Sequence, residues 1–344
     1  MIRAGIIGAT GYVGAELARL LCQHPEVELA SVASIEEVGK LLREVFPHLR
    51  PADVRIQEEL DDVDLVLSAL PHAVSAKALL PYIERGLPVI DLSADFRLHC
   101  PDEYARWYKA EHPAPELLGK DVYGLPELHR QEIAESRLIA VAGCYPTSAI
   151  LALAPAVKAG LIEPDIIVDS KSGVSGAGRT LGLNSHYAEA NEGVRAYGLE
   201  GHRHLPEIVQ ELSLLCEAPA PTVTFLPHVV PMTRGILSAC YARLREGALP
   251  GGERAKEELR TIYRDFYRGE PFTAVVEAPP STKHTLGNNF CLIHPALDER
   301  AGRLIVVSCL DNLVKGAAGQ GIQCMNIMLG FPETAGLQQL APYP

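Results

Sequence analysis

Three glycines near the start of the chain, spaced three residues apart, constrain its fold more than any other feature. Gly8, Gly11 and Gly14 follow the short apolar segment 3–7 and lead into residues 12–24, whose apolar side chains recur at helical spacing. Glycine at such positions permits a tight turn, close approach of a pyrophosphate to the backbone, and close packing of helix on strand. The segment therefore predicts a Rossmann-type dinucleotide-binding unit in which the helix N-terminus faces the phosphates.

Strands and helices alternate through the rest of the first half. Segments 27–32, 64–70 and 87–91 have the length and apolar character of buried strands, and residues 73–85 have helical periodicity. Strands that alternate with helices form a parallel sheet with helices on both faces. The first half therefore predicts an α/β unit.

The second half is expected to contain more strands and fewer helices, which predicts an α+β domain on a mixed or antiparallel sheet. A last helix is expected over 312–328. We therefore expect a dinucleotide-binding domain of residues 1–145 plus 312–344 and a second domain of residues 146–311. The strands expected in the second domain are 165–169, 222–226, 235–244 and 303–310, and the expected loops are 172–182, 245–252 and 278–289.

The composition is that of an ordinary globular protein, and it argues against several partners. The chain has 344 residues and a net charge of −12, which disfavours nucleic acid and anionic membranes but not an anionic small molecule. Its eight cysteines include no C-x-x-C pair, so we expect no metal site, no disulfide framework and a reducing cytoplasm. We see no signal-peptide pattern, and no apolar run approaches the roughly 20 residues that span a bilayer.

One cysteine lies where a thiol becomes a nucleophile. Residues 137–141 form a short apolar strand, Gly143 permits a tight turn, and Pro146 suits the first turn of a helix that continues over 147–157. Cys144 then lies at a helix N-terminus, where N–H groups and the helix dipole favour thiolate over thiol. The alternative is a small buried apolar side chain, as most cysteines are. The position favours the catalytic interpretation.

Two histidines form a second candidate group. His202 and His204 precede an expected helix, and residues two apart in an extended segment point to the same side. Either can relay protons near neutral pH. A metal pair is a competing interpretation, although no third ligand has helical or hairpin spacing to it, and two solvated loop histidines are another.

Two further segments offer contacts for an anion. Arg97 follows the strand that ends at Asp91, and a guanidinium matches a phosphate or carboxylate, but a surface ion pair with Asp95 or Asp102 is an equal alternative. The segment 172–179 is dense with glycine and hydroxyl side chains. It can wrap an anion with backbone N–H groups, or it can be a flexible linker.

These segments together resemble the N-acetyl-γ-glutamyl-phosphate reductase family, which is related to aspartate-semialdehyde dehydrogenase. The resemblance covers nearly the whole chain and implies an enzyme of arginine biosynthesis that uses NADPH to reduce an acyl phosphate to an aldehyde through a cysteine thioester. It rests on GATGYVG (8–14), EVFPHLR (44–50), ALPHAVS (69–75), DLSADFRL (91–98), YGLPEL (123–128), GCYPT (143–147), SKSGVSGAGR (170–179), HRHLPEI (202–208), PHVVPMTRGI (227–236) and DNLVKGAAGQGIQ (311–323).

The resemblance also assigns roles to single residues. Cys144 matches the nucleophile, and His202 and His204 match a histidine pair near the thiol, of which we favour His204 as the acid or base. Arg97 and Arg179 are expected to bind substrate. The second domain is expected to carry catalysis and dimerisation, in a homodimer or homotetramer. The expected cofactor contacts are Gly8, Thr10, Gly11, Tyr12, Val13, Gly14, Ser34, Ser175, Gly176 and Asn312, where Asn312 opens the last helix and lies near the nicotinamide.

Two departures from the family pattern bear on these roles. The family has arginine after the serine that ends the second strand, and this chain has Ile35 followed by Glu36 and Glu37. An arginine there accommodates the 2′-phosphate of NADP, and an acidic residue binds the ribose of NAD. The resemblance therefore implies NADP as the cofactor, and Ile35 leaves NAD as an alternative. The family's proline before the Gly-Cys pair is Ala142 here.

Two other functions stay open at this point. One is a reductase for a carrier-protein-linked acyl phosphate in lysine biosynthesis. The other is a nucleotide-binding protein on a dehydrogenase scaffold, with an inert Cys144.

Overall fold

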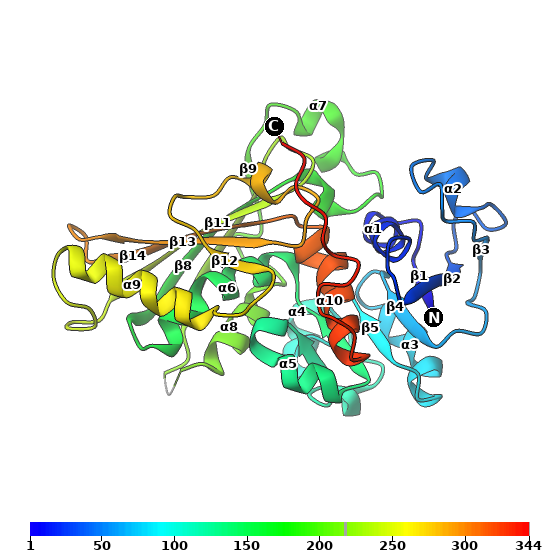
Figure 1. The fold of residues 1–344 in the computed structure, drawn as a ribbon, viewed down its shortest axis with the longest axis horizontal. Helices are drawn as coiled ribbons and strands as arrows, with labels where there is room; N and C mark the ends of the chain where they lie inside the picture. The colour runs from blue at the N-terminus through cyan, green and yellow to red at the C-terminus, as the bar shows by residue number, and fades with distance from the viewer. Residues whose placement is uncertain (217–218, 344) are drawn as a thin grey trace. The chain divides into compact units, whose positions relative to one another are not determined.

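The computed structural model describes residues 1–216 and 219–343, which form two compact units (Figure 1). Unit 1 consists of Met1–Gly143 and Ala317–Gln339, and unit 2 of Cys144–Gly316 with the C-terminal segment from Leu340. The fold class predicted from the sequence is confirmed, since one unit contains a parallel sheet and the other a mixed sheet. The residue limits of the functional domains stay a prediction.

Unit 1 is built on a seven-stranded sheet in which every pair of neighbours is parallel. The strand order is β3-β2-β1-β4-β5-β7-β6, so the direction of winding reverses between β1 and β4. In open parallel sheets, ligands bind at such a reversal, beyond the carboxyl ends of the strands. The strands are β1 (Ile2–Ile7), β2 (Val27–Ala33), β3 (Ile56–Gln57), β4 (Leu65–Ser68), β5 (Val89–Asp91), β6 (Val122–Gly124) and β7 (Leu138–Val141).

Helices cover both faces of this sheet, as predicted. On one face Val66 and Val89 pack with residues of α3 and α4 in a buried cluster that includes Phe96 and Tyr104. On the other face Gly321 of α10 lies against Ile90. The helices of unit 1 are α1 (Tyr12–Leu21), α2 (Leu42–Val45), α3 (Ser75–Glu84), α4 (Pro101–Tyr108), α5 (Pro126–Glu135) and α10 (Gly319–Met328), with a 3₁₀ turn η1 (Pro115–Leu117).

Unit 2 is built on a second seven-stranded sheet, of mixed direction, in the order β12-β13-β14-β11-β8-β10-β9. The pairs β8/β10 and β12/β13 are parallel, and the remaining neighbours are antiparallel. The long β8 alternates buried and exposed residues, as expected of a sheet covered on one face. The strands are β8 (Ile162–Ser172), β9 (Arg195–Ala196), β10 (Thr222–Val229), β11 (Ile236–Leu244), β12 (Thr273–Val275), β13 (Cys291–Asp298) and β14 (Arg303–Leu310).

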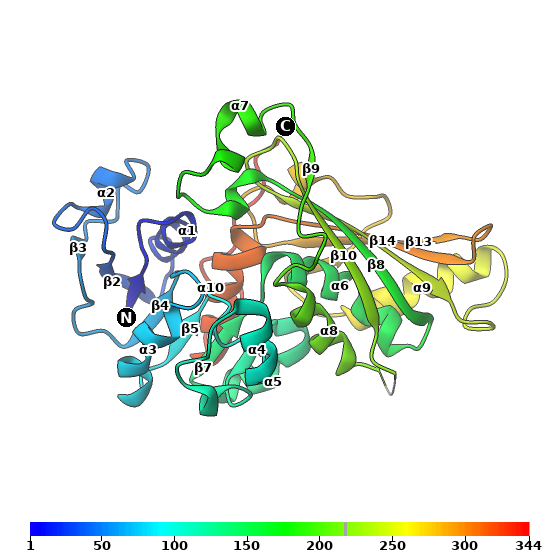
Figure 2. The same ribbon diagram turned by 180° about the vertical axis from the view of Figure 1, so that it is seen from behind.

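Helix α6 lies at the centre of the covered face (Figure 2). Its Ser148 hydroxyl donates to Ser238 Oγ of β11 at 2.9 Å and lies 2.7 Å from Ser308 Oγ of β14. All three serines are fully buried, so these hydrogen bonds satisfy hydroxyls that have no access to water. The helices of unit 2 are α6 (Cys144–Lys158), α7 (Tyr187–Ala190), α8 (Leu205–Ser213) and α9 (Glu253–Phe266), with turns η2 (Val174–Ala177), η3 (Leu183–Ser185), η4 (Thr282–Thr285) and η5 (Val314–Ala318).

Candidate active site

The glycine segment of unit 1 has the shape that a pyrophosphate site needs. Gly8 has φ +84°, and a Cβ there would lie 2.8 Å from the carbonyl oxygen of Ala69. Gly11 is the N-cap of α1. A Cβ on Gly14 would overlap the carbonyl oxygen of Gly8, so only glycine lets the helix approach the strand this closely. The turn therefore brings the first N–H groups of α1, around Tyr12 and Val13, to the carboxyl edge of the sheet.

The end of β2 is tied to the same segment. The hydroxyls of Thr10 and Ser34 lie 2.7 Å apart, and the backbone N–H of Glu36 donates to Ser34 Oγ at 3.1 Å. Ile35, which stands where the resemblance implies arginine, is 95% exposed, and Lys40 pairs with Glu37. The two residues that could substitute for the arginine, Ser34 and Lys40, therefore already have partners within unit 1.

Arg97 is buried in unit 1. Its Nε donates to the carbonyl oxygen of Val141 at 2.7 Å, and its Nη2 donates to that of Leu92 at 2.8 Å. These bonds hold the end of β7, two residues before the Gly-Cys pair. A contact between Arg97 and substrate stays a prediction. Ala142 also contributes to this turn, since its N–H donates to Gly124 O at 3.3 Å, a bond that a proline cannot form.

In unit 2, Cys144 is the first residue of α6. The helix begins three residues earlier than the 147–157 span expected from the sequence, and Pro146 lies in its first turn, where its missing N–H costs no hydrogen bond. Cys144 is partly exposed, whereas the next twelve residues of the helix are buried. Cys144 therefore combines access to solvent with the positive end of the helix dipole.

The two predicted histidines lie together with aromatic side chains from three other segments. The rings of His202 and His204 are 4.8 Å apart, and the ring of Tyr145, the neighbour of Cys144, is 5.8 Å from the first and 5.9 Å from the second. Tyr197 and Phe225 complete this cluster, with rings 5.5 and 5.4 Å from that of His202. We call these five residues the aromatic cluster.

The environments of the two histidines differ. The backbone N–H of His204 donates to Nδ1 of His202 at 3.1 Å, so a neutral His202 carries its proton on Nε2. Burial, with a smaller contribution from Arg203, lowers the pKa of His202 to about 4. His204 Nε2 instead lies 4.0 Å from a carboxylate oxygen of the fully buried Glu207, an ion pair when the ring is protonated. His202 is therefore neutral at physiological pH, and His204 has a carboxylate partner.

The two tyrosines of the aromatic cluster are joined through their hydroxyls. Tyr197 donates to Tyr145 Oη at 3.1 Å, and Tyr145 donates to the carbonyl oxygen of His228. Burial raises the pKa of Tyr145, and the charge of Cys144 adds to that rise. Burial also raises the pKa of Tyr197, again with a contribution from Cys144. Both phenols therefore stay protonated within electrostatic reach of Cys144.

Asn312 does not open the last helix, so that part of the prediction is wrong. The carboxylate of Asp311 accepts the N–H groups of Leu313 and Val314, and the chain then makes a π-helical turn, η5, before α10 begins at Gly319. Asn312, only 2% exposed, accepts the N–H of Gly235 at 2.8 Å.

The segment 172–179 is partly ordered by the same asparagine. Asn312 Nδ2 donates to Ser175 Oγ at 3.0 Å in the 3₁₀ turn η2, so this segment is more than a flexible linker. Gly176, which lies within η2, and Arg179, which follows it, are exposed. The cofactor and substrate contacts expected of Ser175, Gly176, Arg179 and Asn312 stay predictions.

Sequence reasoning missed Tyr145, Tyr197 and Phe225, together with Gly316, which lies against Cys144. Tyr145 had a signal, because it directly follows the candidate nucleophile. Tyr197 and Phe225 had none, since only the pairing of β10 with β8 and β9 brings their segments beside α8.

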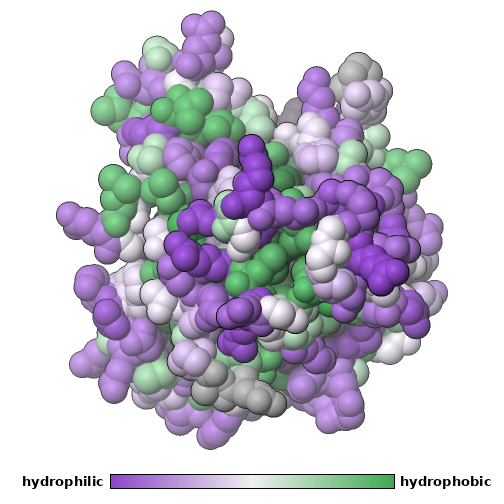
Figure 3. All heavy atoms as spheres, turned by 90° about the vertical axis from the view of Figure 1, so that its left-hand side faces the viewer, coloured by the Kyte–Doolittle hydropathy of each residue, from purple (hydrophilic) through white to green (hydrophobic). Residues whose placement is uncertain are grey.

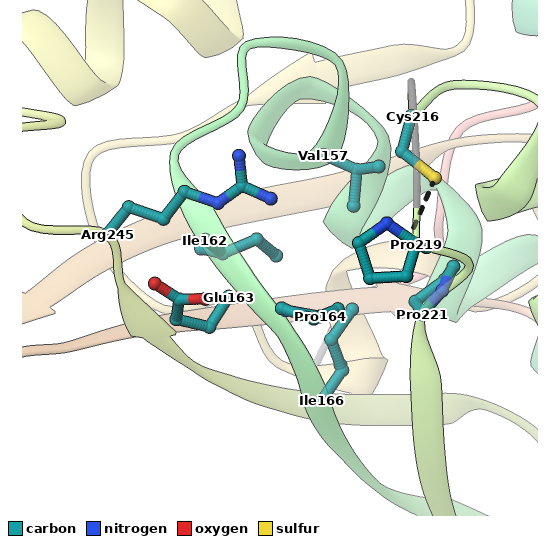
Figure 4. Close-up of a pocket in the computed structure, with 9 residues that line it drawn as sticks. All are labelled: Val157, Ile162, Glu163, Pro164, Ile166, Cys216, Pro219, Pro221 and Arg245. Atoms are coloured by element: carbon teal, nitrogen blue, oxygen red, sulfur yellow. Dashed lines mark hydrogen bonds between the residues drawn. The ribbon is translucent and has the colours of Figure 1, made fainter.

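A separate pocket of unit 2 lies at the C-terminal end of α6 (Figure 4). Val157 and Ile162 line it together with Glu163 and Arg245, and Cys216 lies at its rim with Sγ 3.8 Å from Pro219 O. It includes none of the predicted site residues. Within residues 1–216 and 219–343, no group of three His, Cys, Asp or Glu side chains is placed to hold a metal ion, and no helix is long and apolar enough to cross a bilayer.

Comparison with known proteins identifies the family. Residues 3–136 match the family described as semialdehyde dehydrogenase, NAD binding domain, and residues 144–312 match semialdehyde dehydrogenase, dimerisation domain. The chain is 54% identical over 343 residues to N-acetyl-gamma-glutamyl-phosphate reductase of Dehalococcoides mccartyi (strain ATCC BAA-2266 / KCTC 15142 / 195), covering 99% of both chains. The chain belongs to the N-acetyl-γ-glutamyl-phosphate reductase family. The Geobacter metallireducens enzyme of the same name is 50% identical, with all of both chains covered.

The solved structures that are similar to this member of the reductase family share its fold at low identity. Aspartate semialdehyde dehydrogenase II from Vibrio cholerae superposes with a TM-score of 0.71 at 20% identity, covering 96% of this chain and 99% of that one. The Candida albicans aspartate semialdehyde dehydrogenase, solved with NADP, gives 0.69 at 18% identity, with 96% and 98% covered.

Proposed function

We propose that this member of the family reduces N-acetyl-γ-glutamyl phosphate to N-acetylglutamate semialdehyde with NADPH, in arginine biosynthesis. The observation that carries the proposal is the position of Cys144 at the start of α6, next to the aromatic cluster and its two histidines. The identity of the substrate is supported by relatives that match the whole chain at 50% identity or more.

The chemistry starts with the thiol. Cys144 gives up its proton to His204, and the thiolate attacks the carbonyl carbon of the acyl phosphate. Inorganic phosphate leaves with the electron pair of the C–O bond, and a thioester on Cys144 remains. Hydride addition to this thioester gives the oxyanion of a hemithioacetal. The oxyanion collapses to the aldehyde as the C–S bond breaks, and His204 returns its proton to the departing sulfur, which restores the thiol.

We assign this proton transfer to His204 because His202 is unsuited to it. A ring with a pKa of about 4 binds almost no protons at neutral pH, and its Nδ1 is already occupied by the His204 N–H. His202 instead presents Nε2–H, which can donate to a developing oxyanion.

The residues of unit 1 fit a dinucleotide. A Cβ on Gly8 or Gly14 would strike backbone, so only glycine permits the tight turn that directs the unpaired N–H groups of α1 to the carboxyl edge of the sheet, where a pyrophosphate is expected. The thioester accepts a hydride from NADPH when the cofactor is bound. Ser34 follows β2 and lies 2.7 Å from the Thr10 hydroxyl, and the adenosine ribose is expected at the end of that strand.

The assay that tests the proposal runs the reaction in reverse. N-acetylglutamate semialdehyde, inorganic phosphate and NADP⁺ should yield NADPH, with a strict requirement for phosphate because phosphate cleaves the thioester. A parallel assay with a carrier-protein-linked semialdehyde tests the lysine-pathway substrate. NADPH formation with the carrier-linked substrate alone would overturn the assignment, and formation with neither would indicate a nucleotide-binding protein.

We also propose that the chain forms a homodimer or homotetramer through the uncovered face of the unit 2 sheet. Ile167, Tyr241 and Ile305 are cross-strand neighbours on three adjacent strands, and Ile167 is 40% exposed. Figure 3 shows apolar residues interspersed among hydrophilic ones on the side of the molecule that it draws. Exposed apolar surface favours contact with another chain. Sedimentation velocity on the wild type and on Tyr241→Glu, which places a charge in that row, should show an oligomer and a monomer. A monomeric wild type would contradict this.

A further inference from the structure

A π-helical turn, η5, passes directly against the candidate nucleophile. Gly316, in the middle of Val314–Ala318, donates its backbone N–H to the carbonyl oxygen of Asp311 at 2.9 Å. A Cβ on Gly316 would lie 2.8 Å from Cβ of Cys144 and 3.2 Å from its Cα. Gly316 does not have the positive φ that favours glycine, so the requirement for glycine is one of space.

Neither side of this contact can easily move. Cys144 is the first residue of α6, and Ser148 fixes that helix to β11 and β14 through hydroxyl contacts of 2.9 and 2.7 Å. Leu310 of β14 limits the space on the other side, with Cδ1 3.2 Å from the Cβ position.

The turn itself is held by Asp311. One carboxylate oxygen of Asp311 accepts the N–H of Leu313 and the other accepts that of Gly287, each at 2.8 Å. Because Asp311 is fully buried, these bonds are not exposed to competition from water. Because both α6 and the turn are held, a Cβ on Gly316 would be accommodated at the contact itself, by a shift of the Cys144 side chain.

We propose that Gly316 is a positioning residue for the Cys144 thiol. The π-helical turn inserts an extra residue that brings the backbone within contact distance of Cys144 Cβ, and π-helical turns inside helical segments occur often at functional sites. Contact on that side limits where the Cys144 side chain can lie, which fixes the line along which Sγ meets the acyl carbon. This inference rests on the proposed function, in which the Cys144 thiol is the nucleophile.

Gly316→Ala tests the proposal, with Gly321→Ala as its matched control. Gly321 follows in the same segment, but its Cβ position is 3.4 Å from the nearest atom, Leu92 Cδ2, which is an ordinary contact. For Gly316→Ala we expect kcat to fall about 100-fold, because a displacement of the reacting atom approaching 1 Å costs about that factor. The rate at which iodoacetamide alkylates Cys144, followed against pH, should also change, while the Kd for NADPH stays within about twofold of the wild type.

Gly321→Ala should leave kcat, the alkylation profile and the Kd for NADPH close to wild type. If Gly316→Ala retained wild-type kcat and alkylation behaviour, the proposal would be overturned. The alkylation measurement does not need turnover. A Cys144→Ser variant with wild-type activity would instead reject the proposed function. The alkylation rates of the Gly316→Ala and Gly321→Ala variants would still test whether Gly316 positions the thiol.

A double-mutant cycle covers the case in which Gly316→Ala is too unstable to assay. We expect the substitution to lower the Tm of the wild-type protein by roughly 5 °C, as overpacking does. In a Cys144→Gly background, which lacks the Cβ that the added methyl group would strike, most of that loss should disappear. An equal loss of Tm in both backgrounds would show that the contact with Cys144 is not the one that requires glycine, and would overturn the proposal.

Discussion

The two units present their functional groups in different ways. In unit 1 the surface offered to a dinucleotide is mostly backbone, and it comes from the single short segment 8–14 and the end of β2. In unit 2 the proposed chemistry uses side chains from distant segments, since Cys144 comes from α6 and His204 from the residue before α8. A π-helical turn adds the backbone of Gly316. A backbone site can be recognised in one stretch of sequence, whereas a side-chain site exists only after the sheet has formed.

The difference predicts two patterns of response to mutation. Changes in unit 1 should alter cofactor affinity and leave thiol chemistry intact, while changes around Cys144 should do the reverse. Each experiment below can break that separation.

Cys144→Ser should have the largest effect. A serine hydroxyl is far less ionised than a thiol, so we expect kcat to fall by at least about 1,000-fold. The Kd for NADPH, measured by fluorescence quenching, should be unchanged. A serine variant with near-normal turnover would rule out a thioester on this residue, and a large change in Kd would show that the two units do not respond separately.

Substitution of the two histidines should separate their roles. His204→Asn should lower kcat by about 100- to 10,000-fold and remove the acidic limb of the pH–rate profile. His202→Asn should keep that limb, because a ring with a pKa of about 4 does not titrate between pH 5 and 8. If the limb disappeared with His202 instead, the assignment of the acid and base would be reversed.

The lowered pKa of His202 also predicts a stability effect. His202 binds a proton near pH 6.5 in the unfolded chain but only near pH 4 in the folded one. The free energy of unfolding is therefore unaffected by this residue above pH 6.5, and it decreases as the pH falls from 6.5 toward 4. His202→Asn should remove about 2 kcal/mol of that loss. Urea unfolding of both proteins at pH 7 and pH 4.5 measures it.

The sequence predicts unit 1 better than unit 2, for the same reason that separates the two units. The glycine spacing predicted the turn, the helix and the parallel sheet, since φ at Gly8 and the close approach at Gly14 are local requirements. Of the aromatic cluster, the sequence predicts only His202 and His204. Tyr197 and Phe225 could not be predicted, because strand pairing between segments far apart in the chain brings them to the histidines. Asn312 was misplaced for a related reason. Its role depends on Gly235 and Ser175, which no helical periodicity can indicate.

Gly14→Ala and Gly11→Ala form a matched pair within unit 1. A Cβ on Gly14 would overlap Gly8 O, whereas a Cβ on Gly11 would lie 3.6 Å from that atom. Gly14→Ala should therefore lower Tm and weaken NADPH binding by about 100-fold, while Gly11→Ala should keep the wild-type Tm and weaken binding by about tenfold through contact with the pyrophosphate. Equal Tm values for the two variants would contradict the close packing of α1 on β1.

Ile35→Arg should have the smallest effect on activity, and it tests how the chain chooses between NADPH and NADH. Ser34 and Lys40 are engaged with Thr10 and Glu37, so the wild type should use NADPH with a modest preference over NADH. A charged hydrogen bond from arginine should raise that preference about 10- to 100-fold by lowering the KM for NADPH alone. Ile35→Gln, similar in length but uncharged, is the control. A wild type that already favours NADPH by several decades would show that another basic residue holds the 2′-phosphate.

The central claim is that Cys144 carries the acyl group, and trapping that intermediate tests it most directly. Incubation with N-acetyl-γ-glutamyl phosphate in the absence of NADPH should release one equivalent of inorganic phosphate per active site. Peptide mass spectrometry should then find the N-acetylglutamyl group on Cys144 and on no other cysteine. Full catalytic activity in a preparation that shows neither the phosphate burst nor an adduct on Cys144 would contradict the account.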